Sequence, residues 1–350
     1  MGYSRPGTNG KMQDTGHECR EMVENKPIPM QTFQQPERGD SCVGVVIPTY
    51  RRGAVLLETL THLLELVPPP DEIVVVDQTE VHPPDVEETL QEWERGGQLR
   101  RLRISPPSIP CAMNAGLLQA RGGIVLFLDD DLVPEPGLIA HHRQAHAEHP
   151  DAWAVVGQVL QPGEEPSASP PSRKGGSALR RDLDFAFNGI EPAWVENVMA
   201  GNLSVKRSQA LAVGGFDENF IPPVSFRFET EFARRLVAAG GKIWFEPQAA
   251  IRHLRAGSGG TRARGGHMAS ASPLHGVGDT YYALRRGRGW DRLWHILKRP
   301  FREVCTKYHL RRPWWIPVKF IGELRALVLA IRLHRAGPKL LTTKDASAHE

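Results

Sequence analysis

The sequence predicts an α/β fold in which a mostly parallel central sheet carries helices on both faces and a helical extension lies at the C-terminus. Three observations lead to this prediction. Short β-branched runs alternate with helical patterns from Val43 onward, two of those runs are apolar throughout, and a basic helical segment occupies the last part of the chain. Alternating strands and helices are typical of a parallel sheet that is covered on both faces.

The elements follow in a regular order. The strand VGVVIP, the helix VLLETLTHLLEL and the strand EIVVVD, which ends at Asp77, come first. A polar helix over 86–93, the strand LRRLRI, a helix over 108–120 and the strand IVLFL complete a first half at 41–131. We expect residues 132–255 to form the second half of the same domain, and the polar residues 1–40 to be a disordered leader.

Composition indicates a protein with a large core. Of the 350 residues, 40 % are hydrophobic and 24 % are charged. Four cysteines have neither metal-ligand spacing nor the density of a disulfide framework, which favours reduced thiols in the cytoplasm. Neither a signal peptide nor a run of about 18 apolar residues occurs. We therefore expect a cytoplasmic protein, either soluble or peripheral at the inner face of the membrane.

Two loops and a basic extension are predicted beyond the first half. Residues 162–182 are rich in Pro, Ser and Gly and predict a long loop. Residues 256–275 predict a flexible glycine-rich basic loop, which follows Arg255 and contains Arg262 and Arg264. Residues 276–340 predict a basic helical extension, in which 285–339 hold 15 Lys and Arg against 3 acids, a local charge of +12 against +3 for the whole chain.

Three aspartates, Asp129, Asp130 and Asp131, follow the buried strand IVLFL directly. If the chain stays extended, the first and third face one side and Asp130 faces the other. Ligands of such sheets bind at the carboxyl ends of the strands, and a divalent cation satisfies two converging carboxylates that would otherwise repel. The pattern predicts a site for a metal and a diphosphate, although a solvated acidic turn or a helix cap would also explain it.

Five motifs occur in order between Val43 and His253: VVIPTYRR, VVVDQT, NAGLLQARGGIVLFLDDD, AGNLSVKRSQALAVGGFDENF and ETEFARRLVAAGGKIWFEPQAAIRH. In their order and spacing they resemble the family-2 glycosyltransferases of the GT-A fold. The resemblance implies transfer of a sugar, with inversion, from a nucleotide-diphosphate sugar to a hydroxyl of a glycan, a lipid-linked or a small-molecule acceptor. It further implies Mn2+ or Mg2+ as cofactor, a place in cell-envelope polysaccharide biosynthesis, and binding of the acceptor by residues 132–255.

The resemblance also implies roles for particular residues. The nucleotide would contact Pro48, Thr49, Tyr50, Arg52, Asp77, Asn114 and Asp129. The metal would be held by Asp131, Asp129 and His253, and Glu229 would be the catalytic base. Second candidates for the base or for acceptor binding are Glu231, Asp217 and Asn202.

Three positions depart from the family pattern. Arg51 replaces an asparagine that often precedes the arginine, Met113 stands where an arginine often precedes Asn114, and Phe228 replaces the first acid of the base motif. Residues two apart on a helix do not share a face, so at most one of Glu229 and Glu231 can point into the site. Both acids would also favour a helix N-terminus through the helix dipole.

Other parts of the sequence leave alternatives open. The histidines at 141–142 and 146–149 could bind zinc at their i, i+4 spacing, but without a third ligand a solvated helix face is the expected role. The basic extension suits an anionic membrane, with Phe320, Leu324, Leu327, Val328 and Ile331 on one helical face after Trp314 and Trp315. Packing of that face on its own domain explains it as well, and no nucleic-acid motif accompanies the charge.

Two further function classes remain. A catalytically silent homologue would keep the fold and bind a nucleotide or a sugar. Another metal-dependent nucleotide-sugar enzyme, such as a sugar-phosphate nucleotidyltransferase, would normally show a glycine-rich loop after the first strand, where this chain has PTYRR.

Overall fold

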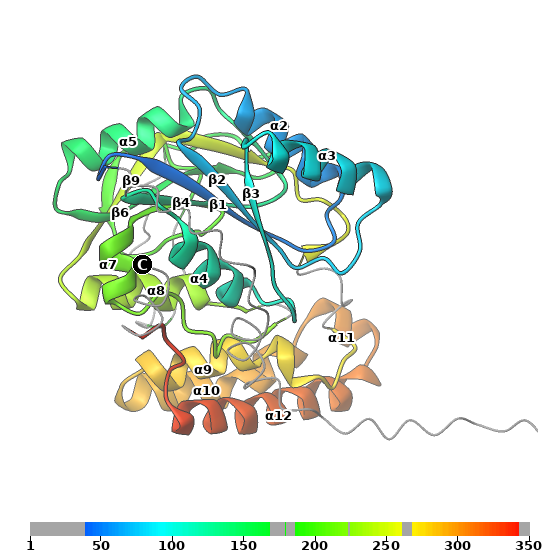
Figure 1. The fold of residues 1–350 in the computed structure, drawn as a ribbon. Helices are drawn as coiled ribbons and strands as arrows, with labels where there is room; N and C mark the ends of the chain where they lie inside the picture. Colours follow the sequence, from blue (N-terminus) through cyan, green and yellow to red (C-terminus); the bar gives the residue numbers. More distant parts are fainter. Residues whose placement is uncertain (1–38, 169–178, 180–185, 223–224, 261–267, 343–350) are drawn as a thin grey trace, which may run out of the picture.

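The computed structural model describes residues 39–168, 179, 186–222, 225–260 and 268–342 (Figure 1). The predicted leader, apart from residues 39 and 40, lies outside the described residues, as do most of the predicted 162–182 loop and the two arginines Arg262 and Arg264.

The centre of the molecule is one sheet with the strand order β3-β2-β1-β4-β8-β6-β9-β5, and β7 pairs with β9. Its strands are β1 (Val43–Thr49), β2 (Glu72–Asp77), β3 (Arg100–Arg103), β4 (Ile124–Leu128), β5 (Leu132–Pro134), β6 (Ala152–Leu160), β7 (Ala193–Val195), β8 (Asn202–Lys206) and β9 (Lys242–His253). The first four strands pair in parallel, as the sequence predicts.

The second half of the sheet differs from the prediction. Strand β8 pairs antiparallel with both β4 and β6, and β5 and β7 pair antiparallel with β9. Four of the eight pairings between the described strands are antiparallel, so the sheet is mixed rather than mostly parallel. The residue pattern of a strand indicates how far the strand is buried, but not whether it runs parallel or antiparallel to its neighbours. In this half the strand directions depend on how the chain connects one strand to the next.

Helices cover both faces of the sheet. They are α2 (Ala54–Leu64), α3 (Pro84–Arg95), α4 (Ile109–Gln119), α5 (Leu138–Glu148), α7 (Arg207–Ala212), α8 (Phe228–Ala238), η2 (Pro273–His275), α9 (Val277–Arg286), α10 (Gly289–Val304), α11 (Lys307–Arg311) and α12 (Trp315–Ala336). Helices α2, α3 and α5 share one core with Val45 and Ile47, whereas α4, α8, α9 and α12 share the other core with Val46. Alternation along β1 thus divides the core into two layers.

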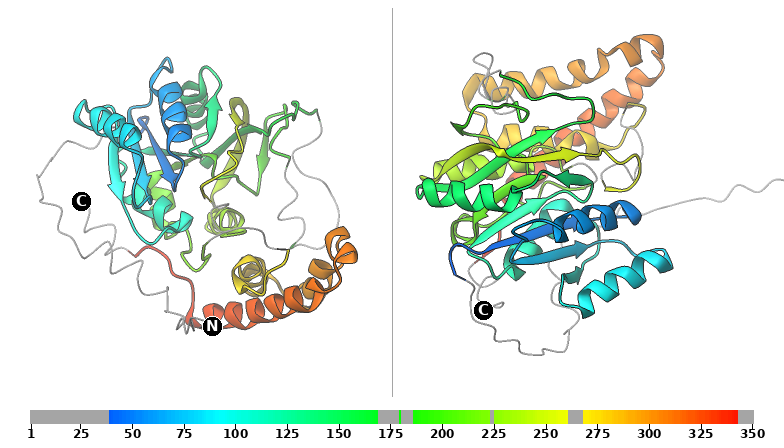
Figure 2. Two further views of the ribbon diagram at one scale, coloured as in Figure 1. Left: turned by 90° about the vertical axis from the view of Figure 1, so that its right-hand side faces the viewer. Right: turned by 90° about the horizontal axis from the view of Figure 1, so that it is seen from above.

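The C-terminal helices form a layer on the side of the sheet opposite α2, α3 and α5 (Figures 1 and 2). Tyr281 and Tyr282 of α9 are completely buried in the core that also contains α8. At the end of the described chain, Asn219 Nδ2 donates a hydrogen bond to the carbonyl of Gly337 over 2.7 Å. The layer is therefore continuous with the core of the sheet domain.

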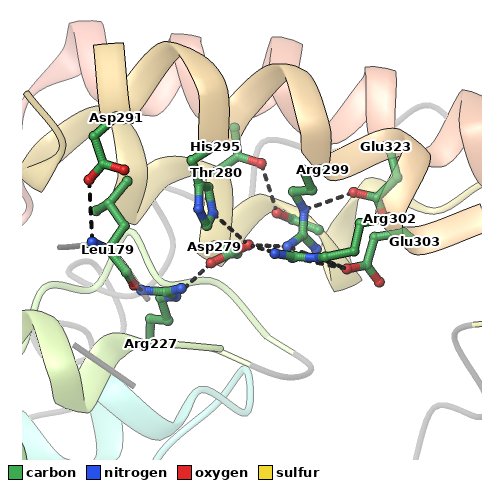
Figure 3. A network of polar contacts seen from close by, with 11 residues as sticks. Leu179, Arg227, Asp279, Thr280, Asp291, His295, Arg299, Arg302, Glu303 and Glu323 are labelled. Atoms are coloured by element: carbon green, nitrogen blue, oxygen red, sulfur yellow. Dashed lines mark hydrogen bonds and ion pairs between the residues drawn. The ribbon is translucent and has the colours of Figure 1, made fainter. Parts of the chain in front are cut away.

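A buried network of charges joins the helices of this layer to one another and to the segment before α8 (Figure 3). The Asp279 carboxylate accepts ion pairs from Arg227, Arg299 and Arg302 and contacts His295 Nε2 at 3.1 Å. Arg299 also pairs with Glu323 of α12 at 2.9 Å. These neighbouring cations hold the pKa of Asp279 far below its usual range, against the effect of burial, which alone would raise it.

Membrane crossing is not supported by the described helices, since none of them combines sufficient length with sufficient hydrophobicity to span a bilayer.

Candidate active site

The carboxyl end of β1 and the residues after it form one wall of the candidate site. Arg51 adopts a positive φ of 56°, which turns the chain sharply after the strand. Its guanidinium pairs with Glu80 at the surface, with 3.1 Å between Nη2 and Oε1, and does not line the cavity. Arg52 instead points inward, and only 8 % of its side chain is exposed.

The aspartate triplet after β4 alternates as the sequence predicts. Asp130 accepts a hydrogen bond from Thr49 Oγ1 at 2.7 Å and pairs with Arg52 Nε at 3.0 Å. Burial raises the pKa of Asp130 to about 7, although the charge of Arg52 opposes the shift. Its side chain therefore belongs to the wall formed by the end of β1.

Asp129 and Asp131 converge with His253, the last residue of β9. The three side chains each offer one ligand atom, and these atoms lie within 4.8 Å of one another. His253 Nε2 lies 3.0 Å from Asp131 Oδ1 and 3.7 Å from Asp129 Oδ2. Antiparallel pairing of β5 with β9 places Leu132 opposite His253 and so fixes this approach. Oxygen and imidazole ligands at this spacing fit a divalent cation such as Mn2+.

The remaining contacts of these residues orient them for such a role. His253 Nδ1 lies 3.0 Å from Gln161 Oε1, and a proton on Nδ1 would make Nε2 the unprotonated nitrogen, the form that coordinates a metal. Asp131 Oδ2 accepts a hydrogen bond from the Ala256 amide at 2.8 Å and an ion pair from Arg52 at 3.3 Å. Burial alone would raise the pKa of Asp131, but His253 and Arg52 hold it below its usual value.

The segment after β9 closes over the end of β1. Arg52 Nη1 donates to the carbonyls of Ala256 and Ser258, and the Gly260 amide donates to the carbonyl of Tyr50 at 2.8 Å. Gly259 and Gly260 have positive φ, and a side chain at either would meet the Arg51 or Arg52 segment. The guanidinium of Arg52 is thus held by groups of the protein itself: the carboxylates of Asp130 and Asp131 and two backbone carbonyls.

A cavity opens between these elements. Its walls come from the ends of β1 and β4, the start of α4 and the segments after β2 and β9. The lining residues are Pro48, Thr49, Tyr50, Arg52, Gln78, Pro107, Ser108, Ile109, Asp129, Asp130, Asp131, Pro222, His253 and Gly260. Seven of the residues predicted for the site lie on it: Pro48, Thr49, Tyr50, Arg52, Asp129, Asp131 and His253.

Sequence reasoning missed the wall formed by Gln78 and Ser108. Gln78 Oε1 accepts a hydrogen bond from the Ser108 amide at 2.6 Å, which brings the start of α4 against the end of β2. Ser108 is 5 % exposed, and its Oγ has no hydrogen-bond partner in the described part of the chain. The sequence did signal Ser108 as the start of a helix, but nothing in it indicated which strand end that start would meet.

Glu229 lies beside the cavity rather than on the lining described above. It is in the first turn of α8, where its Oε1 accepts a hydrogen bond from the Ala200 amide at 2.6 Å. The adjacent Gly201 is packed against the Asp129 carboxylate so closely that a side chain there would collide with it. The pKa of Glu229 is raised to about 7, mainly by burial and also by the nearby charge of Asp129, while the Ala200 amide opposes the shift.

Five other predicted site residues make contacts within the protein and do not line the cavity. Asp77 contacts His82 Nε2 at 2.8 Å, and Glu231 pairs with Arg235 one helical turn away at 2.8 Å. Asn114 bonds both backbone groups of Phe216. Asn202 donates to the Gln158 and Ala249 carbonyls, and Asp217 accepts from Tyr281 Oη at 2.7 Å.

The histidines of α5 correct a prediction. His142 and His146 are buried, not on a solvated helix face, and both approach Ser204 Oγ, at 2.8 Å and 2.9 Å. Burial lowers the pKa of His142 to about 4 and that of His146 to about 3, so both are neutral at pH 7. Among the described residues, they are not part of a three-residue metal-ligand group.

Residues 44–202 match the family model described as glycosyl transferase family 2. This segment is similar to glycosyl transferase family 2. It contains β1 to β4, the aspartate triplet and the start of β8. The family-2 segment thus supplies Asp129 and Asp131, while His253 and Glu229 come from residues after it.

Solved structures support the fold. Over 79 % of this chain, GalNAc-T7 in complex with UDP, GalNAc and Mn2+ is similar with a TM-score of 0.51 and 15 % identity. The chain spans only 56 % of the length of that structure. The GT-A fold predicted from the sequence is therefore confirmed, with the mixed sheet described above.

Two other structures were also matched. The mannosyltransferase PcManGT from Pyrobaculum calidifontis, in complex with GDP-Man and Mn2+, has a TM-score of 0.48 and 20 % identity over 87 % of this chain and 77 % of its own. The S. aureus protein TarS (residues 1–349) has a TM-score of 0.48 and 15 % identity over 82 % of this chain and 83 % of its own. No curated protein matches the chain.

Proposed function

We propose that this protein transfers a sugar from a nucleoside-diphosphate sugar to an acceptor hydroxyl by a single displacement with inversion. The observation that carries the proposal is the convergence of Asp129, Asp131 and His253 within 4.8 Å at the cavity beside the end of β1. Two carboxylates and an imidazole at the rim of a cavity suit a ligand that carries both a diphosphate and a divalent cation. The family-2 match of residues 44–202 supports the same activity.

In this proposal Mn2+ or Mg2+ would be held by Asp129, Asp131 and His253. When bound there, the cation would neutralise charge on the diphosphate leaving group. Asp130 and Arg52 serve a different purpose. Their buried pair at 3.0 Å holds the turn after β1 against the aspartate triplet, so the predicted contact of Arg52 with the nucleotide would be indirect.

The nucleoside would occupy the part of the cavity between Tyr50, Gln78 and Ser108. Pro48, Thr49 and Tyr50 line this part. Ser108 Oγ, which has no hydrogen-bond partner in the described part of the chain, would offer a buried hydrogen-bonding group to the ligand. Asp77 would act through its backbone and its neighbours, because its carboxylate is held by His82 and by the Thr79 amide.

Glu229 would act as the catalytic base. Inversion requires that the acceptor hydroxyl lose a proton as its oxygen attacks the anomeric carbon and the bond to the diphosphate breaks. Oε1 is held by Ala200, which leaves Oε2 to accept that proton. A carboxylate whose pKa is raised to about 7 by burial is well matched to proton transfer near neutral pH. The neighbouring Glu231 is neutralised by Arg235 and serves the helix.

The test is a panel of nucleotide sugars with the full chain, measured with and without Mn2+ as donor hydrolysis and as protection from thermal unfolding. We expect one nucleotide family to stabilise the protein only with the cation present, and its sugar to be released to water or to an added acceptor. Nucleotide protection with no turnover on any acceptor would instead identify a silent homologue. Release of pyrophosphate from a nucleoside triphosphate and a sugar phosphate would identify a nucleotidyltransferase.

A further inference from the structure

Helix α10 exposes five large apolar side chains to solvent. Trp290, Leu293, Trp294, Leu297 and Phe301 recur at spacings of three and four residues, so they form one stripe along the helix. Each of these side chains is between 44 % and 73 % exposed. Isolated exposed apolar residues are ordinary on a protein surface, whereas a continuous stripe that contains two tryptophans marks a surface made for contact.

The opposite side of α10 carries the polar groups that face the protein. His295 and Arg299 are buried, and both contact the Asp279 carboxylate (Figure 3). Arg299 also bridges to Glu323 of α12. Because this network fixes the rotation of α10 about its axis, the apolar stripe cannot turn inward without leaving a buried charge unpaired.

The exposed apolar surface continues on α12. The rings of Phe301 and Phe320 meet with their centroids 5.7 Å apart. Next to Phe320, the side chains of Ile321, Leu324 and Val328 are exposed at helical spacing. On its inner side α12 buries Ala326 and Ala330, together with the ion pair of Lys319 and Glu323 at 2.7 Å. The α10 stripe and these three α12 side chains are called the docking face below.

Exposed cations are frequent on the helices that carry the docking face. Exposed basic residues of α10, α11 and α12, with the turns between them, are Arg288, Arg292, Lys298, Arg302, Lys307, Arg311, Arg312, Arg325, Arg332 and Arg335. The three acids in the same segment are partly or fully buried: Asp291, Glu303 and Glu323. The Lys298 ammonium lies 5.9 Å from the centre of the Trp294 ring, at the edge of the stripe.

We propose that the docking face binds the surface of an anionic membrane. An apolar stripe that contains two tryptophans, on helices that also expose Lys and Arg, complements the acyl chains, the negative headgroups and the interface between them. The charge complementarity favours this occupant over a second copy of the chain, because two copies would bring their basic helices together. The sequence suggested a membrane face on α12 alone, whereas the structure assigns the larger part to α10.

The proposal does not rest on the glycosyltransferase activity, and its experiment does not use it. The full-length protein is sedimented with vesicles of phosphatidylcholine alone and of phosphatidylcholine with phosphatidylglycerol, at low salt and at 1 M salt. We expect at least tenfold more protein on the anionic vesicles at low salt, and release at 1 M salt, where the Debye length is about 3 Å.

Two variants test the residues. The double variant Trp290→Ser/Trp294→Ser should bind the anionic vesicles at least tenfold more weakly, while the matched Trp194→Ser change, at a tryptophan of β7 that is 46 % exposed, should leave binding unchanged. Circular dichroism and thermal unfolding check that each variant is folded. A second double variant, Lys298→Glu/Arg325→Glu, should weaken binding to anionic vesicles without altering the fold.

Three results would overturn the proposal. The first is a wild-type protein that ignores anionic vesicles at low salt, and the second is equal binding by the folded Trp290→Ser/Trp294→Ser variant. The third is a dimer in sedimentation velocity that the same variant dissociates, without vesicle binding, because the docking face would then be covered by a second copy.

Discussion

At the scale of single residues, the candidate site depends on which way each aspartate of the triplet points. Asp130 faces Thr49 and Arg52, whereas Asp129 and Asp131 face His253. Alternation along an extended chain was enough to predict this division from the sequence. The sequence could not show that Arg52 forms ion pairs with Asp130 and Asp131, because that pairing depends on the turn after β1 and on the segment 254–260.

Asp131→Asn should weaken Mn2+-dependent donor binding by at least tenfold, because it removes the charge of a ligand that His253 also contacts. Asp130→Asn should change the affinity for Mn2+ much less, since Asp130 faces the other wall. Calorimetric titration of each folded variant with the donor, at several Mn2+ concentrations, measures both effects. Equal losses of metal dependence in the two variants would contradict the assignment.

Glu229→Gln should lower the rate of sugar transfer by roughly a hundredfold or more, the scale of a lost general base, and leave donor affinity nearly unchanged. The amide oxygen of glutamine can still accept the Ala200 hydrogen bond, so the geometry of the first turn of α8 is preserved. Steady-state kinetics and donor titration provide the two readouts. Glu231→Gln is not a suitable control, because it breaks the buried ion pair of Glu231 with Arg235. Unchanged transfer in Glu229→Gln would show that another acid is the catalytic base.

The pH dependence of transfer follows from the same residue. Burial raises the pKa of Glu229 to about 7, and a base must be deprotonated to act, so kcat should fall as the pH drops below about 7. The decline should disappear in Glu229→Gln, whose residual rate does not depend on this group. A wild-type profile that stays flat from pH 8 to pH 5 would show that Glu229 does not supply the base.

Glu229 should also affect stability, in a direction that its raised pKa determines. Between the unfolded value near 4.5 and the folded value near 7, the folded state holds the extra proton, so stability falls as the pH rises through this window. Glu229→Gln should therefore be about 1–3 kcal/mol more stable than the wild type at pH 8 and nearly equal to it at pH 4.5. Urea unfolding at the two pH values measures the difference.

At the scale of elements, the local patterns predicted the first half of the sheet and missed the direction of the second. The runs VGVVIP, EIVVVD and IVLFL form β1, β2 and β4 in parallel, because helices of ten or more residues connect them. The sequence segment NLSVK forms β8, which enters antiparallel beside β4 and carries no signal of that direction. His253 reaches the aspartates only because β9 pairs with β5 and β6 at once.

The element that carries Glu229 is held by the C-terminal helices. Arg227 has a positive φ of 72° immediately before α8, and its side chain pairs with Asp279 of α9 at 2.5 Å. Arg227 Nη1 also donates a hydrogen bond to the carbonyl of Leu179 at 2.9 Å. A strained backbone position at the start of α8 is thus secured by a buried ion pair from a different layer.

Asp279→Asn should destabilise the protein by about 3–5 kcal/mol, since it leaves Arg227 and Arg299 as buried cations without their shared carboxylate. Because folding lowers the pKa of Asp279, the stability that its charge contributes is present at neutral pH. It is lost as the pH falls through the pKa of Asp279 in the folded state. The matched control is Asp151→Asn, which breaks an exposed pair with Lys242 and should leave the stability nearly unchanged. Chemical unfolding at pH 7 compares the two.

At the scale of the whole molecule, the C-terminal segment is a layer of the fold and also a surface. The sequence showed its charge and its helical pattern, and left open whether the apolar residues face the protein or the solvent. The structure divides them: Tyr281, Tyr282, Ala326 and Ala330 are buried, whereas the α10 stripe is exposed. Asp279 determines which side of α10 faces inward, because His295 and Arg299 of that helix both contact its carboxylate.

Removing this layer should therefore unfold the protein rather than release a soluble catalytic core. A chain that ends at Pro273 loses the buried tyrosines of α9, each of which contributes about 1.5–3 kcal/mol by burial, and loses the contacts of Asp217 with Tyr281 and Lys339. These losses are comparable with the total stability of a domain, about 5–15 kcal/mol.

A chain that ends at Thr342 keeps every contact between described residues and serves as the control. We expect the shorter chain to show no cooperative thermal transition, and the longer one to unfold like the full-length protein. A Pro273 truncation that melts cooperatively and still binds the donor would show that the sheet domain is stable by itself.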